Sequence, residues 1–226
     1  VLFPVGGKAM LDYLLDRYAP FVDRFFVVVR PEDESAVRRH CARRSLRVEL
    51  AVQSRPTGML DAILVAGESV RRQDPAAVWV TWCDQIAIRG ETAAALAEWS
   101  ERDPEAVLIF PTMRGPEPYI HFVRDAGGEI CAVLHRREGD DMPETGESDV
   151  GLFHLSARGY FELLPEFTRQ VTRGPATGER NFLPFIPWLR GRGRVCTFAG
   201  REPIEALGAN TPADVERLER HFRDGC

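Results

Sequence analysis

The apolar positions of the first 112 residues follow two periods in turn. Apolar side chains three or four positions apart, such as Leu11, Leu14 and Leu15, indicate a helix, whereas a short run such as FFVVV at 25–29 indicates a buried strand. Helices are expected over 10–19, 31–44, 58–72 and 91–103. Strands are expected over 25–29, 47–53, 78–83 and 106–112. This alternation predicts an α/β fold in which a parallel sheet is flanked by helices on both faces.

The second half of the chain has a different pattern. Two β-like runs around the turn sequence DAGG predict a hairpin over 119–136, and the run 137–149 is expected to be a polar loop because it has almost nothing to bury. Further strands are expected over 149–156 and 193–199, and helical or partly helical segments over 157–170 and 180–191. Thr211 as N-cap and Pro212 at the first helical position predict a closing helix over 211–222.

Length and composition fit a single globular domain. The 226 residues are 44% hydrophobic and 28% charged, and we expect one domain over 1–226 with a first half at 1–112 and a second half at 113–226. The net charge of -5 and the lack of a basic stripe argue against nucleic-acid binding. Without a long apolar run or a signal-peptide pattern, the chain is expected to be cytoplasmic and to contact no membrane.

The cysteines favour free thiols over a disulfide framework or a zinc site. They are odd in number, far apart and without CxxC spacing. The five positions are Cys41, Cys83, Cys131, Cys196 and Cys226.

A carboxylate follows directly on the apolar strand VWVTWC. In open parallel sheets, ligands bind beyond the carboxyl ends of the strands, so Asp84 is expected at the ligand-binding edge. The alternative is that Asp84 caps a turn or helix. Asn210, just before the N-cap Thr211, is expected at the same edge. A carboxylate and an amide oxygen suit Mg²⁺ that is held together with substrate phosphates.

Further candidates lie in the segment QSRPTGMLDAI, residues 53–63. Gln53 ends a strand, Gly58 stands where the backbone must turn tightly or approach a ligand, and Asp61 falls in the first turn of a helix. A glutamine amide offers a donor and an acceptor together, which matches the edge of a nucleobase. The alternative is an ordinary strand-to-helix loop.

Six segments occur in a fixed order along the chain. They are PVGGKAMLDYLL, QxxxxGMLDAI, VxVxxCDQ, SDVGLF, GERNFL and ExxGANTPAD. In this order and spacing the chain resembles the sugar-1-phosphate nucleotidylyltransferases, which include N-acetylglucosamine-1-phosphate uridylyltransferase and glucose-1-phosphate thymidylyltransferase. The resemblance implies a Rossmann-like fold with a mixed, mostly parallel sheet and a small β-hairpin subdomain that binds the sugar. It also implies a reaction in which a phosphate oxygen of the acceptor attacks the α-phosphorus of an NTP and pyrophosphate is released.

The same resemblance implies roles for individual positions. The catalytic, Mg²⁺-binding residues would be Asp84 and Asn210. The nucleotide-binding residues would be Gln53, Gly58, Asp61 and Asp84. The acceptor-binding residues would be Asp149, Gly151 and Glu179. The partners would therefore be an NTP and a phosphorylated small molecule.

The sequence also departs from the family pattern at several positions. Cys83 replaces the usual glycine before the metal aspartate, and PYIH at 118–121 and VLHRR at 133–137 replace a Gly-Tyr-Gly turn and a Val-Glu pair. These departures leave the NTP and the acceptor open. They admit as an alternative a cytidylyltransferase that acts on a non-sugar phosphate or phosphonate.

The family's first strand and Gly-rich segment, which cradle the triphosphate, are expected to lie before Val1. Lys8 is the only lysine, and it matches a position next to the following helix, so it does not replace the triphosphate-binding lysine. Two explanations remain. Either the chain belongs to a longer polypeptide, or it is a catalytically inactive nucleotide-binding or scaffold domain.

Overall fold

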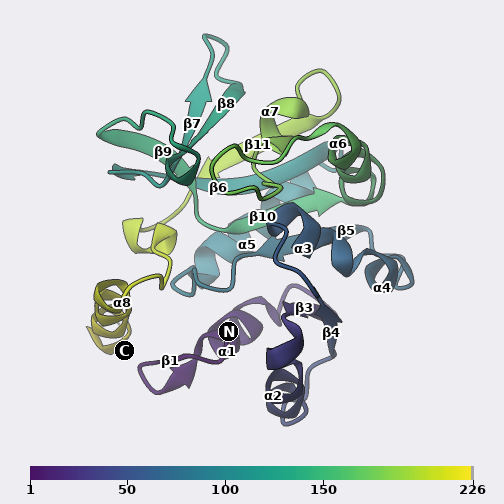
Figure 1. Ribbon diagram of the computed structural model, residues 1–226, viewed down its shortest axis with the longest axis vertical. Coiled ribbons are helices and arrows are strands. Elements are labelled where there is room, and N and C mark those ends of the chain that lie inside the picture. The colour runs from purple at the N-terminus through teal and green to yellow at the C-terminus, as the bar shows by residue number, and fades with distance from the viewer. Residues whose placement is uncertain (225–226) are drawn as a thin grey trace.

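The computed structural model describes residues 1–224, in which helices cover both faces of a central sheet (Figure 1). The helices are α1 (Met10–Tyr18), α2 (Pro31–Cys41), α3 (Met59–Val65), α4 (Gly67–Arg71), α5 (Gly90–Arg102), α6 (Leu164–Gln170), α7 (Phe185–Trp188) and α8 (Pro212–Asp224). The strands are β1 (Pro4–Val5), β2 (Lys8–Ala9), β3 (Phe25–Val29), β4 (Val48–Val52), β5 (Ala77–Thr81), β6 (Ala106–Pro116), β7 (Ile120–Arg124), β8 (Ile130–His135), β9 (Thr145–Asp149), β10 (Leu152–Ser156) and β11 (Arg194–Ala199). The remaining helical turns are the 3₁₀ turns η1 (Arg136–Glu138) and η3 (Pro203–Ala206) and the π-helical turn η2 (Gly159–Leu163).

The main sheet has the strand order β11-β6-β10-β5. Strands β6 and β11 are parallel, and β10 is antiparallel to both β5 and β6, so β5, β6 and β11 point the same way and β10 is reversed. Strand β9 extends the far end of β6, with Asp149 opposite Thr112. Strands β3 and β4 form a separate parallel pair. The expected α/β fold with a mixed, mostly parallel sheet is confirmed.

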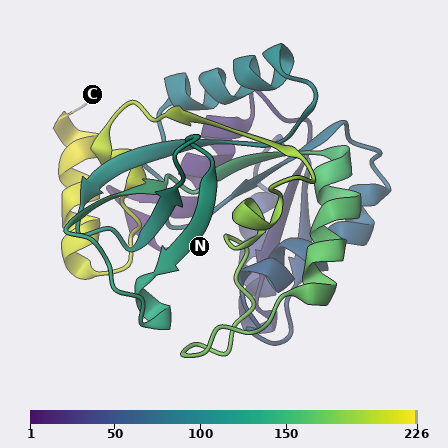
Figure 2. The same cartoon turned by 90° about the horizontal axis from the view of Figure 1, so that it is seen from above.

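Alternate residues of β6 supply two hydrophobic cores on opposite faces of the sheet. Leu108 and Phe110 belong to the core that also contains residues of α3, α6 and α7. Ile109 belongs to the core that contains residues of α1 and α5. Figure 2, which views the sheet from above, shows α5 on one side and α7 on the other. The helices on both faces therefore follow from the alternation of apolar side chains along one strand.

Strands β3 and β5, in the N-terminal half, are among those that keep an unpaired edge. Within residues 1–224, β3 pairs with β4 alone and β5 pairs with β10 alone. The apolar side chains of Phe26, Val28, Val78 and Val80 are only half-buried, although such residues are normally covered in a parallel sheet. Each of the two strands therefore presents an edge that a further strand can pair with.

Two expected elements differ in the structure. The helix expected over 58–72 is divided into α3 and α4 around Ala66, where Gly67 lowers the helix propensity. The expectation of a polar loop over 137–149 was wrong for its last residues, because 145–149 forms β9. That segment is held by backbone pairing with β6, which its polar side chains do not reveal.

Cys41, Cys83, Cys131 and Cys196 are free thiols, and Cys226 lies outside the described residues. No helix among residues 1–224 is both long and apolar enough to cross a membrane.

Candidate functional site

A cleft of about 1240 Å³ lies beyond the end of β5. One wall is formed by the β6–β9 region and the turn after β8, and the other by the segment 203–217 that leads into α8. Residues 171–175 and 181–184 close a third side. Three of the expected site residues, Asp84, Asp149 and Asn210, line this single cleft although they are far apart in the sequence.

Asp84 and Asn210 lie close together in the lining of the cleft. The backbone N–H of Ala209 donates to the carbonyl oxygen of Asp84 over 3.0 Å, which ties the segment after η3 to the end of β5. A Cβ atom on Gly208 would lie 2.5 Å from Asp84 Oδ2 and 2.5 Å from Asn210 Nδ2. Only a glycine therefore leaves room for both polar side chains to face the same space.

Two further side chains brace this segment, and sequence reasoning missed both. Glu205 is fully buried, and its carboxylate accepts hydrogen bonds from the backbone N–H groups of Arg201 (2.7 Å), Glu202 (2.8 Å) and Arg89 (3.2 Å). Gln85 Nε2 donates to the carbonyl oxygen of Ala206 over 3.1 Å. A signal existed for Glu205, because it opens the ExxGAN segment, but its partners lie in separate turns.

Asp149 is a buried carboxylate that faces the cleft. Its Oδ1 accepts hydrogen bonds from Trp82 Nε1 (3.1 Å) and from the backbone N–H of Gly151 (2.8 Å). Burial raises the pKa of Asp149 to about 6, and the nearby Asp84 adds to that increase. A carboxylate that lines a cleft can accept hydrogen bonds from the donors of a ligand.

Gly151 holds the Asp149 carboxylate through its backbone N–H. Its φ is +74°, and a Cβ atom there would overlap Gln85 Oε1 and lie 2.8 Å from Trp82 Cδ1. Gly151 itself is not part of the cleft lining. Its role in the structure is to let the strand end turn closely past the side chains that build the cleft wall.

Three of the expected nucleotide-binding residues, Gln53, Gly58 and Asp61, lie beside the cleft and do not line it. Gln53 Nε2 donates to the carbonyl oxygen of Gly58 over 3.2 Å, and Asp61 forms an ion pair with Arg180. Gly58 has a φ of +120°, and a Cβ atom there would lie 2.5 Å from the backbone N and O of Arg180. Met59, the next residue, does line the cleft. The segment that carries Arg180 therefore lies directly against the expected nucleotide loop.

Glu179 lies in the same segment, 34% exposed, with its Oε1 3.7 Å from Arg137 Nη2. It faces the turn after β8 and does not line the cleft. Glu138 in that turn lines the cleft, and its carboxylate binds the segment 174–181 through several hydrogen bonds. The sequence singled out Glu179 and missed Glu138.

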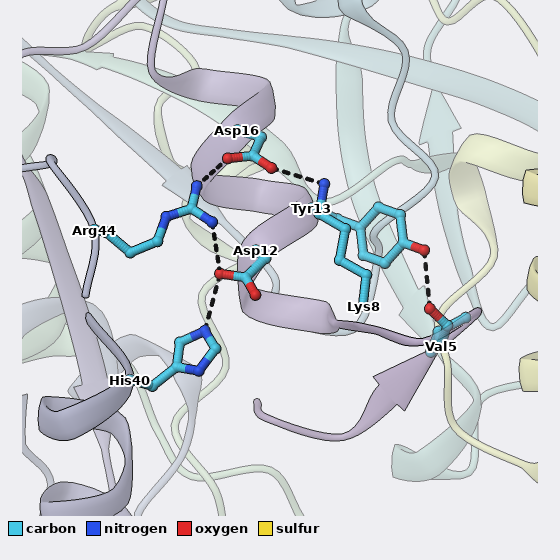
Figure 3. Close-up of polar contacts among 7 residues, drawn as sticks. All are labelled: Val5, Lys8, Asp12, Tyr13, Asp16, His40 and Arg44. Atoms are coloured by element: carbon cyan, nitrogen blue, oxygen red, sulfur yellow. Dashed lines mark hydrogen bonds and ion pairs between the residues drawn. The ribbon is translucent and has the colours of Figure 1, made fainter. Parts of the chain in front are cut away.

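Lys8 lies outside the cleft. Its Nζ pairs with Asp16 over 2.7 Å and lies 4.6 Å from the centre of the Tyr13 ring. Figure 3 shows Arg44 joining Asp12 and Asp16 in the same group of polar contacts on α1. The only lysine of the chain is thus engaged in joining N-terminal elements.

Comparisons with known proteins give one family and two kinds of relative. A family profile described as MobA-like NTP transferase domain matches residues 1–148. The chain is 28% identical over 231 residues to the bifunctional protein GlmU of Solibacter usitatus (strain Ellin6076), covering 99% of this chain and 47% of that protein. It is 26% identical over 230 residues to GlmU of Pseudomonas entomophila (strain L48), with the same coverage. The chain spans about half the length of these curated relatives.

Two solved structures share the fold at low sequence identity. A CMP:2-keto-3-deoxy-manno-octonic acid synthetase in complex with CTP aligns with a TM-score of 0.68 and 15% identity, over 100% of this chain and 92% of that chain. The 4-diphosphocytidyl-2C-methyl-D-erythritol synthase of Anaerococcus prevotii DSM 20548 aligns with a TM-score of 0.66 and 11% identity, over 98% and 92%.

Proposed function

The chain belongs to the family of MobA-like NTP transferase domains, and from this premise we propose an Mg²⁺-dependent nucleotidyl transfer to a phosphorylated small molecule. In the proposed reaction, an oxygen of the acceptor phosphate forms a bond to the α-phosphorus of the NTP. The bond from the α-phosphorus to the oxygen that bridges to the β-phosphorus breaks, and pyrophosphate leaves with that oxygen. Such a reaction needs positioning and charge neutralisation and no nucleophilic side chain.

The observation that carries the proposal is the convergence of Asp84 and Asn210 beside Gly208. The two groups fit Mg²⁺, because a carboxylate oxygen and an amide oxygen are both hard ligands. The oxygen and nitrogen of an Asn side chain exchange places when the amide turns over, so Asn210 can present its oxygen to the ion. Among residues 1–224 no three His, Cys, Asp or Glu side chains gather as a metal site, so substrate phosphates and water would complete the coordination. When bound, the ion would neutralise charge on the phosphates.

The remaining expected residues divide between the two substrates. We propose that Gln53 and Gly58 contact the base and that Asp61 lies beside the nucleotide, in a loop that borders the cleft. On the acceptor side, Asp149 would accept hydrogen bonds from the acceptor's hydroxyl groups, with Gly151 shaping the wall and Glu179 at the edge.

The proposed reaction can use different nucleotides and different acceptors. The names of both solved structures described above contain a cytidine nucleotide group, diphosphocytidyl in one and CMP in the other. This supports CTP as the first donor to test. A cytidylyl transfer to a non-sugar phosphate or phosphonate is therefore the second candidate function. The polar turn 136–141 and Glu117 and Tyr119 shape the part of the cleft where such an acceptor would differ from a sugar.

The triphosphate needs a phosphate cradle, and the open edges of β3 and β5 support an additional strand beside them. We infer that the family's first strand pairs there and that the Gly-rich segment after it reaches the cleft. The coding sequence upstream of Val1 tests this inference. A start codon at Val1 would contradict it.

The proposed function is tested by pyrophosphate release from the complete polypeptide. Each of the four NTPs is combined with a panel of sugar 1-phosphates, non-sugar phosphates and phosphonates, with Mg²⁺ or with EDTA. Asp84→Ala should abolish release for the active pair. Asp33→Ala, which removes an exposed carboxylate on α2 that pairs with Arg30, is the matched control and should turn over normally.

Two outcomes would count against the proposal. Undiminished turnover by Asp84→Ala would remove this residue from the reaction. A wild-type protein that binds an NTP yet turns over no pair in the panel would favour the catalytically inactive nucleotide-binding domain instead.

A further inference from the structure

Glu138 is used in the structure as a clamp on a distant segment. Its carboxylate accepts hydrogen bonds from the backbone N–H groups of Ala176 (3.0 Å) and Thr177 (3.3 Å). It also accepts from Thr177 Oγ1 (2.5 Å) and Asn181 Nδ2 (3.0 Å). The side chain is 9% exposed. Four donors therefore converge on one nearly buried carboxylate, and hydrogen bonds to an ionised group are the strong ones.

The clamped segment, residues 174–181, is closed on itself. Gly174 N–H donates to the carbonyl oxygen of Glu179 over 2.8 Å, and Gly178 N–H donates to that of Gly174 over 2.9 Å. A Cβ atom on Gly174 would overlap the carboxylate of Glu138. The segment is thus shaped to fit this one side chain.

The other end of the segment is joined to the expected nucleotide loop. Arg180 N–H donates to the carbonyl oxygen of Thr57 over 2.9 Å, and Leu60 N–H donates to that of Arg180 over 3.1 Å. The guanidinium of Arg180 pairs with Asp61. Gly58 lies against the backbone of Arg180 with no space for a side chain. A shift of Arg180 would therefore displace the loop that begins at Gln53.

We propose that Glu138 is a positioning residue for the nucleotide: from the acceptor side of the cleft it holds segment 174–181, and through Arg180 it sets the loop at 53–58. This inference rests on the proposed function, because it assumes that this loop binds the base. A carboxylate whose lone pairs are occupied by four donors is committed to the segment, so Glu138 acts through Arg180 and not on the substrate. The hydrogen bonds lower the pKa of Glu138 to about 2, which keeps the clamp ionised at neutral pH.

The physical consequence is a population effect. When a binding-competent arrangement is only partly populated, the apparent dissociation constant rises in inverse proportion to that population. In Glu138→Gln an amide NH₂ replaces one carboxylate oxygen and opposes N–H and O–H donors. The segment then spends less time docked, and the nucleotide must pull it into place on binding.

The test measures NTP binding without any acceptor, so that turnover is not the readout. Isothermal titration of the complete protein with each NTP and Mg²⁺ should give a dissociation constant about tenfold higher for Glu138→Gln than for the wild type. The matched control is Glu129→Gln at the turn of the same hairpin, where the exposed side chain pairs with exposed Arg190. It should bind the nucleotide like the wild type.

The outcomes separate this inference from the proposed function. A wild-type protein that binds no NTP would overturn the proposed function itself. If the wild type binds an NTP and Glu138→Gln binds it with equal affinity, only the positioning role is overturned.

A second variant keeps the test decisive if Glu138→Gln fails to fold. Thr177→Val removes one of the four donors and leaves the carboxylate in place, and it should weaken NTP binding about threefold. In each variant that folds, hydrogen exchange should become faster in residues 174–181 and also in residues 53–60. Faster exchange confined to 174–181 would show that the segment does not set the nucleotide loop.

Discussion

Asp84 and Asn210 meet beside Gly208 at the end of β5. A Cβ atom on that glycine would lie 2.5 Å from Asp84 Oδ2 and from Asn210 Nδ2, so both polar side chains face the same small space. Asp84 comes from the strand end, whereas Asn210 arrives from the segment before α8 and is tied by Ala209 to the Asp84 backbone. The two halves of the chain therefore complete the proposed metal site together.

Gly208→Ala should separate these two ligands without breaking the fold. The added methyl group would push Asp84 and Asn210 apart, and metal coordination tolerates such displacement poorly. We expect at least about tenfold weaker Mn²⁺ binding, measured by electron paramagnetic resonance, and a similar loss of Mg²⁺-dependent turnover.

The control for this change is Gly67→Ala, at the start of α4. No atom lies within 4 Å of a Cβ atom there, and alanine favours a helix more than glycine does. The control should stabilise the protein slightly and bind Mn²⁺ normally. Equal Mn²⁺ binding by Gly208→Ala and the wild type would contradict the convergence of the two ligands.

Much of the fold follows from local sequence pattern. The two periods of apolar residues placed α1, β3, α2, β4, β5, α5 and β6, because burial of one helix face or of a whole strand requires them. The strand-end rule placed Asp84 in the cleft, and the motif order gave the family, which the match over residues 1–148 confirms.

The parts that the sequence did not reveal are held by contacts between residues that lie far apart in the chain. Glu138 sits in a polar run that resembles a loop, and its partners Thr177 and Asn181 lie 39 and 43 residues further on. Strand β9 was missed for a similar reason, since its pairing with β6 uses backbone groups that every residue has. Neither leaves a spacing or a periodicity that a single sequence can show.

Asp149→Asn should stabilise the metal-free protein at neutral pH. The folded-state pKa of Asp149, about 6, lies above its unfolded value, so the folded state favours the protonated form. The stability that depends on this proton is complete below the unfolded pKa and is lost as the pH rises through 6. An asparagine keeps the oxygen that accepts from Trp82 and Gly151 and carries no charge. The gain at pH 7.5 should be about 2 to 3 kcal/mol.

Urea unfolding in EDTA at pH 4, 5, 6 and 7.5 measures this difference. The gain of Asp149→Asn over the wild type should be small at pH 4 and grow up to about pH 6. A gain that is the same at all four pH values, or a variant less stable at pH 7.5, would show that the carboxylate is not strained by burial. Acceptor affinity should fall in the same variant if Asp149 binds the acceptor.

His154 should give the opposite pH dependence. It lies in β10 opposite Ile109 and Trp79, is 8% exposed, and its Nδ1 has no hydrogen-bond partner within residues 1–224. Burial lowers the pKa of His154, so the unfolded chain binds the proton more readily and stability falls as the pH drops below about 6.5. His154→Leu should remove this loss and change stability at pH 8 by less than about 1 kcal/mol. If the difference in unfolding free energy between the wild type and His154→Leu is the same at pH 8 and pH 5, the predicted effect of burial on His154 is refuted.

Gly151 and Gly191 provide a matched pair for the steric role of the cleft wall. Their φ angles are +74° and +73°, so alanine meets the same backbone penalty of about 1 kcal/mol at both positions. A Cβ atom at Gly191 contacts nothing within 4 Å, whereas one at Gly151 overlaps Gln85 and crowds Trp82. Gly151→Ala should therefore lower the free energy of unfolding by about 2 kcal/mol more than Gly191→Ala does, as measured by urea denaturation.

Because Gln85 also holds Ala206, Gly151→Ala alone of the two variants should weaken Mn²⁺ binding at Asp84 and Asn210. Equal costs for the two alanines would mean that Gln85 and Trp82 move aside freely and do not fix the wall.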